Sequence, residues 1–202
     1  WSRQTDLSSY GLGAVAPLPE DTISAWDWVF PEDWDLTGMG MGLTENKDIG
    51  LVFLEEAVFD VPYATLPTIE EAVQVEVGKE VTIVGWGQQT SDQQPPPGTV
   101  GLKQWGTSFI NEVADAEFQV GATSSDTRKC HGDSGGPSFM TVETDSTETQ
   151  RLVGVTSHAY DETDCAAKGG VDTRVDHYLT WIDEQMRSRC EDGTRVWCEV
   201  EG

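Results

Sequence analysis

Ser134 lies in the segment of this sequence with the clearest chemical potential, the octet C-H-G-D-S-G-G-P at residues 130–137. A serine nucleophile must project from a tight bend, with backbone N–H groups free to stabilise the oxyanion of a tetrahedral intermediate. Glycines on both sides of Ser134 permit such a bend and let a substrate approach the backbone closely. A glycine-rich turn is the simpler interpretation, but the complete string has a chemical logic that a turn does not need. The octet therefore predicts a nucleophilic serine.

The octet resembles the nucleophile motif of the chymotrypsin/trypsin-like serine proteases, and further matches follow in the family's order. The string N-K-D-I-G-L-V at residues 46–52 is similar to the family's N-D-I-A-L-L segment, with one residue inserted before the aspartate. This match makes Asp48 the acid of the triad, at about the spacing from the serine that the template has. A surface aspartate before a strand would be the default if Asp48 stood alone. Other matches lie at residues 85–87 (G-W-G), 153–157 (V-G-V-T-S) and 169–182.

The resemblance implies an activity and a set of roles. The activity is hydrolysis of peptide bonds through an acyl-enzyme on Ser134, with no cofactor and no metal. The N–H groups of Gly132 and Ser134 would form the oxyanion hole. Asp133 would be the buried carboxylate that holds this loop in its active shape.

The same resemblance implies a pocket for the substrate side chain, with Arg128 at its base because this residue lies six positions before the nucleophile. The pocket residues are Arg128, Ser157, Ala159, Gly170 and Asp172. A buried guanidinium needs a partner, because an unpaired charge there is costly. The partner is either an acidic substrate side chain or Asp172, and we favour the internal pair, which leaves a smaller, neutral pocket. A preference for Lys or Arg is not expected unless Asp126 shifts into the pocket.

The template also requires a histidine about 45 residues before the acid, and this position falls near or before Trp1. The sequence contains His131, His158 and His177, all after Asp48. His131 or His158 is a conceivable substitute base, although neither is expected to place its ring between Ser134 and Asp48. Two explanations stay open. The sequence begins after the histidine, so that residues 1–202 alone are inactive, or the protein is a non-catalytic relative that binds peptides or proteins. We favour the first, because the missing part is one contiguous block.

Several short elements must position these residues. Apolar runs and alternating patterns predict strands at residues 49–54, 81–86, 106–113, 117–120, 136–142, 151–157 and 170–175, with a hairpin tip at 143–150. Leu179, Ile182 and Met186 recur at helical spacing after a possible cap, Asp176, which predicts a helix near residues 177–187. Residues 1–47 show no sustained pattern and are expected to be irregular.

The expected fold class is all-β, because short strands with glycine-rich connections predict an antiparallel barrel or sandwich. The family resemblance implies two antiparallel six-stranded barrels of the trypsin-like fold, with the first barrel incomplete and a helix at the C-terminal end. We expect one protease domain at residues 1–189 and a tail loop at residues 190–202.

The net charge of the chain restricts the classes of partner that it can bind. The chain has 36 acidic and 12 basic residues and a net charge of −24, which disfavours binding to nucleic acid phosphates or to an anionic membrane. No stretch has the length of a transmembrane helix. We expect a monomer whose partner is a peptide or protein substrate.

The four cysteines indicate an oxidising compartment. No C-x-x-C pair and no zinc-ligand spacing occurs, so disulfides are favoured over a metal site. The resemblance implies a bond between Cys130 and Cys165, whereas sequence proximity alone suggests one between Cys190 and Cys198. A secreted, extracellular or periplasmic protein is therefore expected.

Overall fold

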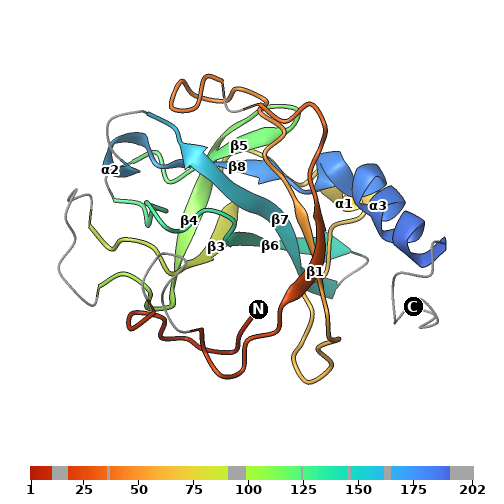
Figure 1. The fold of residues 1–202 in the computed structure, drawn as a ribbon. Coiled ribbons are helices and arrows are strands. Elements are labelled where there is room, and N and C mark those ends of the chain that lie inside the picture. Colours follow the sequence, from red (N-terminus) through yellow and green to blue (C-terminus); the bar gives the residue numbers. More distant parts are fainter. Residues whose placement is uncertain are drawn as a thin grey trace.

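A closed antiparallel barrel of six strands, in the order β3-β4-β5-β8-β7-β6, forms the main body of the structure (Figure 1). This computed structural model describes residues 1–10, 18–35, 37–90, 99–123, 125–144, 147–161 and 165–191. The barrel strands are β3 (Glu80–Gly85), β4 (Gln104–Val113), β5 (Glu117–Val120), β6 (Pro137–Thr144), β7 (Thr147–Ala159) and β8 (Gly170–Arg174). All six strands were predicted within a few residues of these bounds, and β6 and β7 form the predicted hairpin.

Alternating apolar side chains from these strands fill the barrel. On β3, Val81 and Ile83 are buried, and they meet Phe118 of β5 and Val153 of β7 in one apolar cluster. In a strand, successive side chains point to opposite faces, so the alternation in the sequence leads directly to this core. The strand β5 is buried at all four of its positions, so that both of its faces are covered. Buried polar groups on β5 and β8 therefore need partners inside the protein.

A second, two-stranded sheet pairs β1 (Ala25–Val29) with β2 (Leu51–Leu54) in antiparallel register. The strand β1 lies in the region expected to be irregular, so that expectation was wrong at residues 25–29. In the described part of the chain, these two strands are all that represents the first barrel, which is incomplete as predicted. Trp28 of β1 and Val52 of β2 are paired across the strands, and each is 64% exposed.

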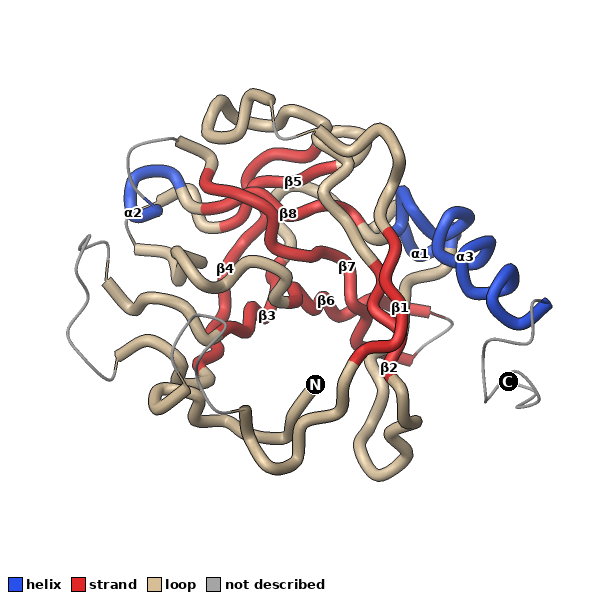
Figure 2. Tube along the Cα trace, in the orientation of Figure 1, coloured by secondary structure: helices blue, strands red, loops and turns tan. Residues whose placement is uncertain are grey.

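Helices lie at the periphery of the strands (Figure 2). The short helices are α1 (Ile69–Ala72) and α2 (Cys165–Lys168), and the predicted C-terminal helix is α3 (Leu179–Glu191), which follows a single 3-10 turn at Asp176–Tyr178. Asp176 does not cap this helix, because its carboxylate pairs with Arg174 at 2.6 Å. The ion pair between Arg189 and Asp27 joins α3 to β1. None of the described helices is long and apolar enough to cross a membrane.

Candidate functional site

Ser134 is exposed in a tight turn that leads into β6. Two backbone hydrogen bonds close the turn: Asp133 N–H donates to the Cys130 carbonyl at 3.0 Å, and Gly136 N–H donates to the Asp133 carbonyl at 2.8 Å. A third, from Gly135 N–H to the Thr156 carbonyl at 2.9 Å, anchors the turn to β7. Ser134 thereby comes to line a cavity of about 270 Å³. The octet thus forms a tight turn in which Ser134 is exposed.

The backbone around Ser134 leaves donors unused. Among the described residues, the N–H groups of Gly132 and Ser134 have no protein acceptor. Gly132 has φ +94°, a conformation that favours glycine because it has no Cβ. Unused N–H groups beside a nucleophile are what an oxyanion hole requires.

Asp133 fixes the shape of this loop through its carboxylate. Its two oxygens accept hydrogen bonds from Gly87 N–H at 2.7 Å and from Cys130 N–H at 2.8 Å. A Cβ on Gly85 would lie 1.9 Å from Oδ1 of Asp133, and one on Gly87 would lie 2.7 Å from the same oxygen. The two glycines of the G-W-G string, Gly85 and Gly87, therefore leave the room that the Asp133 carboxylate occupies.

Asp48 is connected to the Ser134 cavity through Ser157. The Ser157 hydroxyl donates to Oδ2 of Asp48 at 2.7 Å, and Ser157 lines the same cavity as Ser134. The other carboxylate oxygen, Oδ1, accepts a hydrogen bond from Trp34 Nε1 at 3.1 Å. The hydroxyl of Thr173 on β8 donates to the Asp48 carbonyl at 2.8 Å. Asp48 thus bonds a residue that lines the Ser134 cavity, and Trp34 is a neighbour that the sequence did not indicate.

A buried carboxylate holds the loop before Asp48. Glu117 on β5 is fully buried and accepts hydrogen bonds from the N–H groups of Thr44, Glu45 and Asn46 at 2.7, 2.9 and 3.1 Å. Two non-glycine residues in this segment have positive φ, Glu45 at 58° and Lys47 at 53°, a conformation that needs support from its surroundings. The sequence analysis missed Glu117, and no local pattern marks it.

His158 is buried in the wall of the cavity. Its Nδ1 lies 2.9 Å from the Ser157 hydroxyl, and its Nε2 lies 3.3 Å from the Gly42 carbonyl. The ring is therefore linked to Asp48 only through Ser157. His131 is exposed, and His177 packs against the ring of Tyr178 at 4.9 Å. Among the described contacts, no histidine bonds Ser134 or Asp48.

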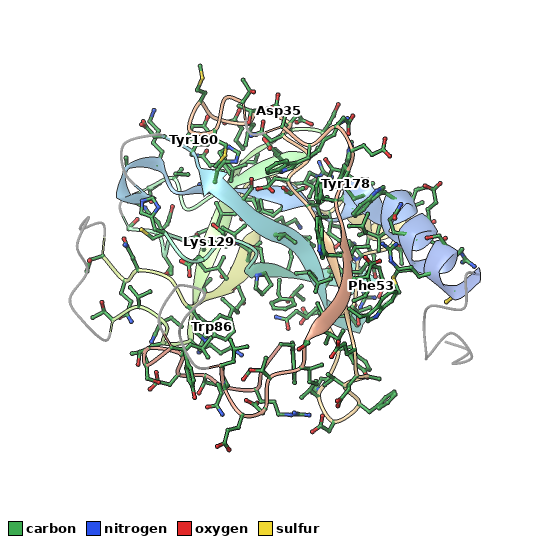
Figure 3. The ribbon with its side chains drawn as sticks, in the orientation of Figure 1. Asp35, Phe53, Trp86, Lys129, Tyr160 and Tyr178 are labelled. Carbon is green, nitrogen blue, oxygen red and sulfur yellow. The ribbon has the colours of Figure 1, made fainter. Side chains whose placement is uncertain are left out.

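The expected Arg128–Asp172 pair does not form. Lys129, the next residue, donates to both oxygens of Asp172 and to the Ser138 hydroxyl, each at 2.8 Å. Arg128 turns away, donates through Nε to the Thr123 carbonyl at 3.1 Å, and lines a separate cavity. Of the expected pocket residues, Ser157, Ala159 and Gly170 line the Ser134 cavity. Asp172 is fully buried and lies behind Lys129, which is labelled near the middle of the view in Figure 3.

Burial and a neighbouring charge shift the pKa of Lys129 in opposite directions. Burial lowers the pKa of its ammonium group below the usual value, while the Asp172 carboxylate opposes this change. The side chains of Lys129 and Asp172 are 3% and 0% exposed. The two charges therefore neutralise each other inside the protein.

The described residues test only part of the disulfide hypothesis. None of the described cysteines is free, and Cys130 and Cys190 are disulfide-bonded. The side chain of Cys165, like the whole of Cys198, lies outside the described residues. The pairing of Cys130 with Cys165 and of Cys190 with Cys198 stays a prediction. Within the described ranges, no group of three or more potential ligands could hold a metal ion.

Known proteins resemble this chain over most of its length. The family model for trypsin matches residues 28–182. The chain is 28% identical to melanization protease 1 of Drosophila melanogaster over 74% of its own length and 40% of the relative's. It is 34% identical to kallikrein-8 of Mus musculus, with coverages of 56% and 43%, and 30% identical to the CLIP domain-containing serine protease B14 of Anopheles gambiae, with coverages of 69% and 42%. The chain thus spans less than half the length of these curated relatives. The matched region contains the barrel, Ser134 and Asp48, and this chain belongs to the trypsin family of serine proteases.

Proposed function

We propose that Ser134 and Asp48 are the nucleophile and the acid of a serine endopeptidase that hydrolyses peptide bonds through an acyl-enzyme. The hydrogen bond from Ser157 to Asp48 carries this proposal, because Ser157 and Ser134 line one cavity. Nucleophile and acid of a triad must meet at one site for a base between them to bond both. The exposed Ser134 with unused N–H groups beside it adds support.

In the proposed reaction, the Ser134 hydroxyl attacks the peptide carbonyl carbon, and the N–H groups of Gly132 and Ser134 stabilise the oxyanion. The amine product then leaves, and water hydrolyses the acyl-enzyme. Asp48 orients the imidazole that accepts the Ser134 proton. Because no histidine of residues 1–202 bonds Ser134 or Asp48 in the described structure, we propose that a histidine outside this range supplies the base. Residues 1–202 alone are then essentially inert.

The substrates are peptides or proteins, acted on by a single protease domain over residues 1–189 in a monomeric, secreted protein. The cysteine content supports an oxidising compartment. The net charge of −24 argues against nucleic acid and anionic membranes as partners.

The experiment compares residues 1–202 with the complete protein. A fluorophosphonate probe, which labels activated serines, should label Ser134 of the complete protein quickly and that of residues 1–202 slowly. In the complete protein, Ser134→Ala should lower kcat by about 10⁴-fold or more. Ser188→Ala, at an exposed serine of α3, is the matched control and should leave kcat unchanged. Rapid labelling of residues 1–202 would contradict the need for an external base.

A second function, peptide binding without cleavage, has one observation in its favour. Trp34 and Ser157 together occupy both carboxylate oxygens of Asp48, and an imidazole would have to displace or share the Trp34 bond. If the complete protein binds peptides but mass spectrometry finds no cleavage, this second function is correct. Cleavage that Ser134→Ala abolishes decides for the endopeptidase.

A further inference from the structure

A charged side chain, that of Lys129, lines the Ser134 cavity and is paired with a carboxylate inside the protein. Lys129 lines the cavity, and its ammonium group contacts Ser138 of β6 and Asp172 of β8, both of which are fully buried. A lysine ammonium group has three donors and no acceptor. The Ser138 hydroxyl and the Asp172 carboxylate, both at 2.8 Å, accept hydrogen bonds from this group, and the carboxylate balances its charge.

The carboxylate of Asp172 is also withdrawn from the cavity. It lies behind Lys129 and does not line the cavity itself. Its position is fixed by packing, because a Cβ on Gly154 of β7 would lie 2.7 Å from Oδ2 of Asp172. A substrate cation in the cavity would meet the ammonium group of Lys129 before it met this carboxylate.

Apart from Lys129, the residues that line the cavity include no Asp, Glu or Arg, although His131 and His158 are among them. Ser157, Ala159 and Gly170 are uncharged, and Gly170 leaves room, since a Cβ added there would make only ordinary contacts, at 3.5 and 3.8 Å. Taking a charged side chain out of water without a partner is costly. A charged substrate side chain would therefore lose hydration in this cavity and gain no ion pair.

We infer that the Lys129–Asp172 pair is a specificity-determining element, and that the cavity accepts an uncharged side chain of the substrate while it rejects Lys, Arg, Asp and Glu. This inference rests on the proposed function, because it takes the cavity beside Ser134 as the pocket for the residue that precedes the cleaved bond. The substrate class is thus peptides with an uncharged residue at that position.

Binding of three small aromatic probes to residues 1–202 tests the inference without requiring catalysis. Benzamidine, benzoate and benzamide have similar size and shape but are positive, negative and neutral at about pH 7.5. Amide chemical shifts of residues 157–159 and 170 report binding in the cavity. We expect benzamide to bind at least tenfold more tightly than either charged probe. Tighter binding of a charged probe, or no shift with any probe, would overturn the inference.

Two variants identify the pair as the cause. Lys129→Met leaves Asp172 without its counter-charge, and the affinity for benzamidine relative to benzamide should rise at least tenfold. Lys129→Met combined with Asp172→Leu removes both charges and is the matched control, which should keep the preference for benzamide. If Lys129→Met does not fold, the double variant still tests the inference. A double variant that no longer prefers benzamide over the charged probes would refute the role of the neutral pair.

The outcomes separate this inference from the proposed function. A complete protein that cleaves no peptide contradicts the endopeptidase but leaves the probe selectivity of the cavity in place. Conversely, a complete protein that cleaves mainly after Lys or Arg would support the endopeptidase and overturn the neutral pocket.

Discussion

Replacement of Glu117 by Gln tests whether a buried carboxylate on the barrel holds the loop that carries Asp48. Oε2 of Glu117 accepts hydrogen bonds from the N–H groups of Thr44 and Glu45, and Oε1 accepts one from Asn46 N–H. A glutamine can direct its single oxygen at the first two donors, but its NH₂ group then faces the third. One charge-assisted bond is lost, one buried N–H group is left without an acceptor, and the other two bonds are weakened.

The magnitude follows from these contacts. A hydrogen bond to a charged group contributes about 1.5–3 kcal/mol, and an unsatisfied buried donor costs about 1–3 kcal/mol. Since the two effects concern the same N–H group and the loop can relax, we expect Glu117→Gln to lower the free energy of unfolding by about 2–4 kcal/mol. For a domain of this size, this corresponds to a decrease in Tm of about 4–16 °C.

Urea unfolding followed by tryptophan fluorescence measures the global effect, and hydrogen exchange of residues 44–48 measures the local one. The control is Glu112→Gln on β4, where an exposed carboxylate accepts one hydrogen bond from Tyr160; it should change stability by less than about 1 kcal/mol. If Glu117→Gln is as stable as this control and the loop amides keep their protection, Glu117 does not hold the loop.

Two further substitutions test buried groups elsewhere. The buried hydroxyl of Tyr178 has no hydrogen-bond partner among the described residues, so Tyr178→Phe should leave the free energy of unfolding unchanged or raise it by up to about 1 kcal/mol; a loss above about 1 kcal/mol in urea unfolding would contradict this. Burial, reinforced by nearby carboxylates, raises the pKa of Tyr178 to about 12, so an ultraviolet titration should find this tyrosine still protonated at about pH 11. The hydrogen bond from Arg151 lowers the pKa of Glu71 below its ordinary value of 4.5, and the folded state therefore gains stability from this pair above about pH 4.5 and loses it as the pH falls through the lowered pKa. Arg151→Met should remove most of this acid dependence in Tm measurements between about pH 3 and 6, and an unchanged dependence would show that the pair does not cause it.

Local sequence was sufficient to predict the turn that carries Ser134 and the barrel strands. The glycines around Ser134 restrict the chain to few conformations, and the hydrogen bonds of the turn run mostly within the octet itself. Alternation of apolar residues predicted the strands because the side-chain period of two is a property of the strand alone. The strand β1 was missed, because its sequence A-W-D-W-V does not alternate between apolar and polar residues, and its pairing with β2 comes from the tertiary fold.

The pocket could not be derived in the same way. Arg128 and Lys129 are neighbours in an irregular segment, so no periodicity decides which side chain turns inward. The choice depends on Ser138 and Asp172, which reach Lys129 from two different strands. The sequence predicted that a basic side chain pairs with Asp172. It did not predict that this side chain is Lys129 and not Arg128.

The sequence by itself therefore determined the family, the turn that carries Ser134 and the barrel strands, because each of these depends on contacts between residues close in the chain, on a strict period or on motifs in a fixed order. Only the tertiary structure decided that Lys129 faces Asp172 and that Glu117 holds the loop before Asp48. The N–H groups that Glu117 binds are 71 to 73 residues away in sequence. A buried charge takes its role from whichever partner the fold brings to it, and that partner is not encoded in its immediate neighbours.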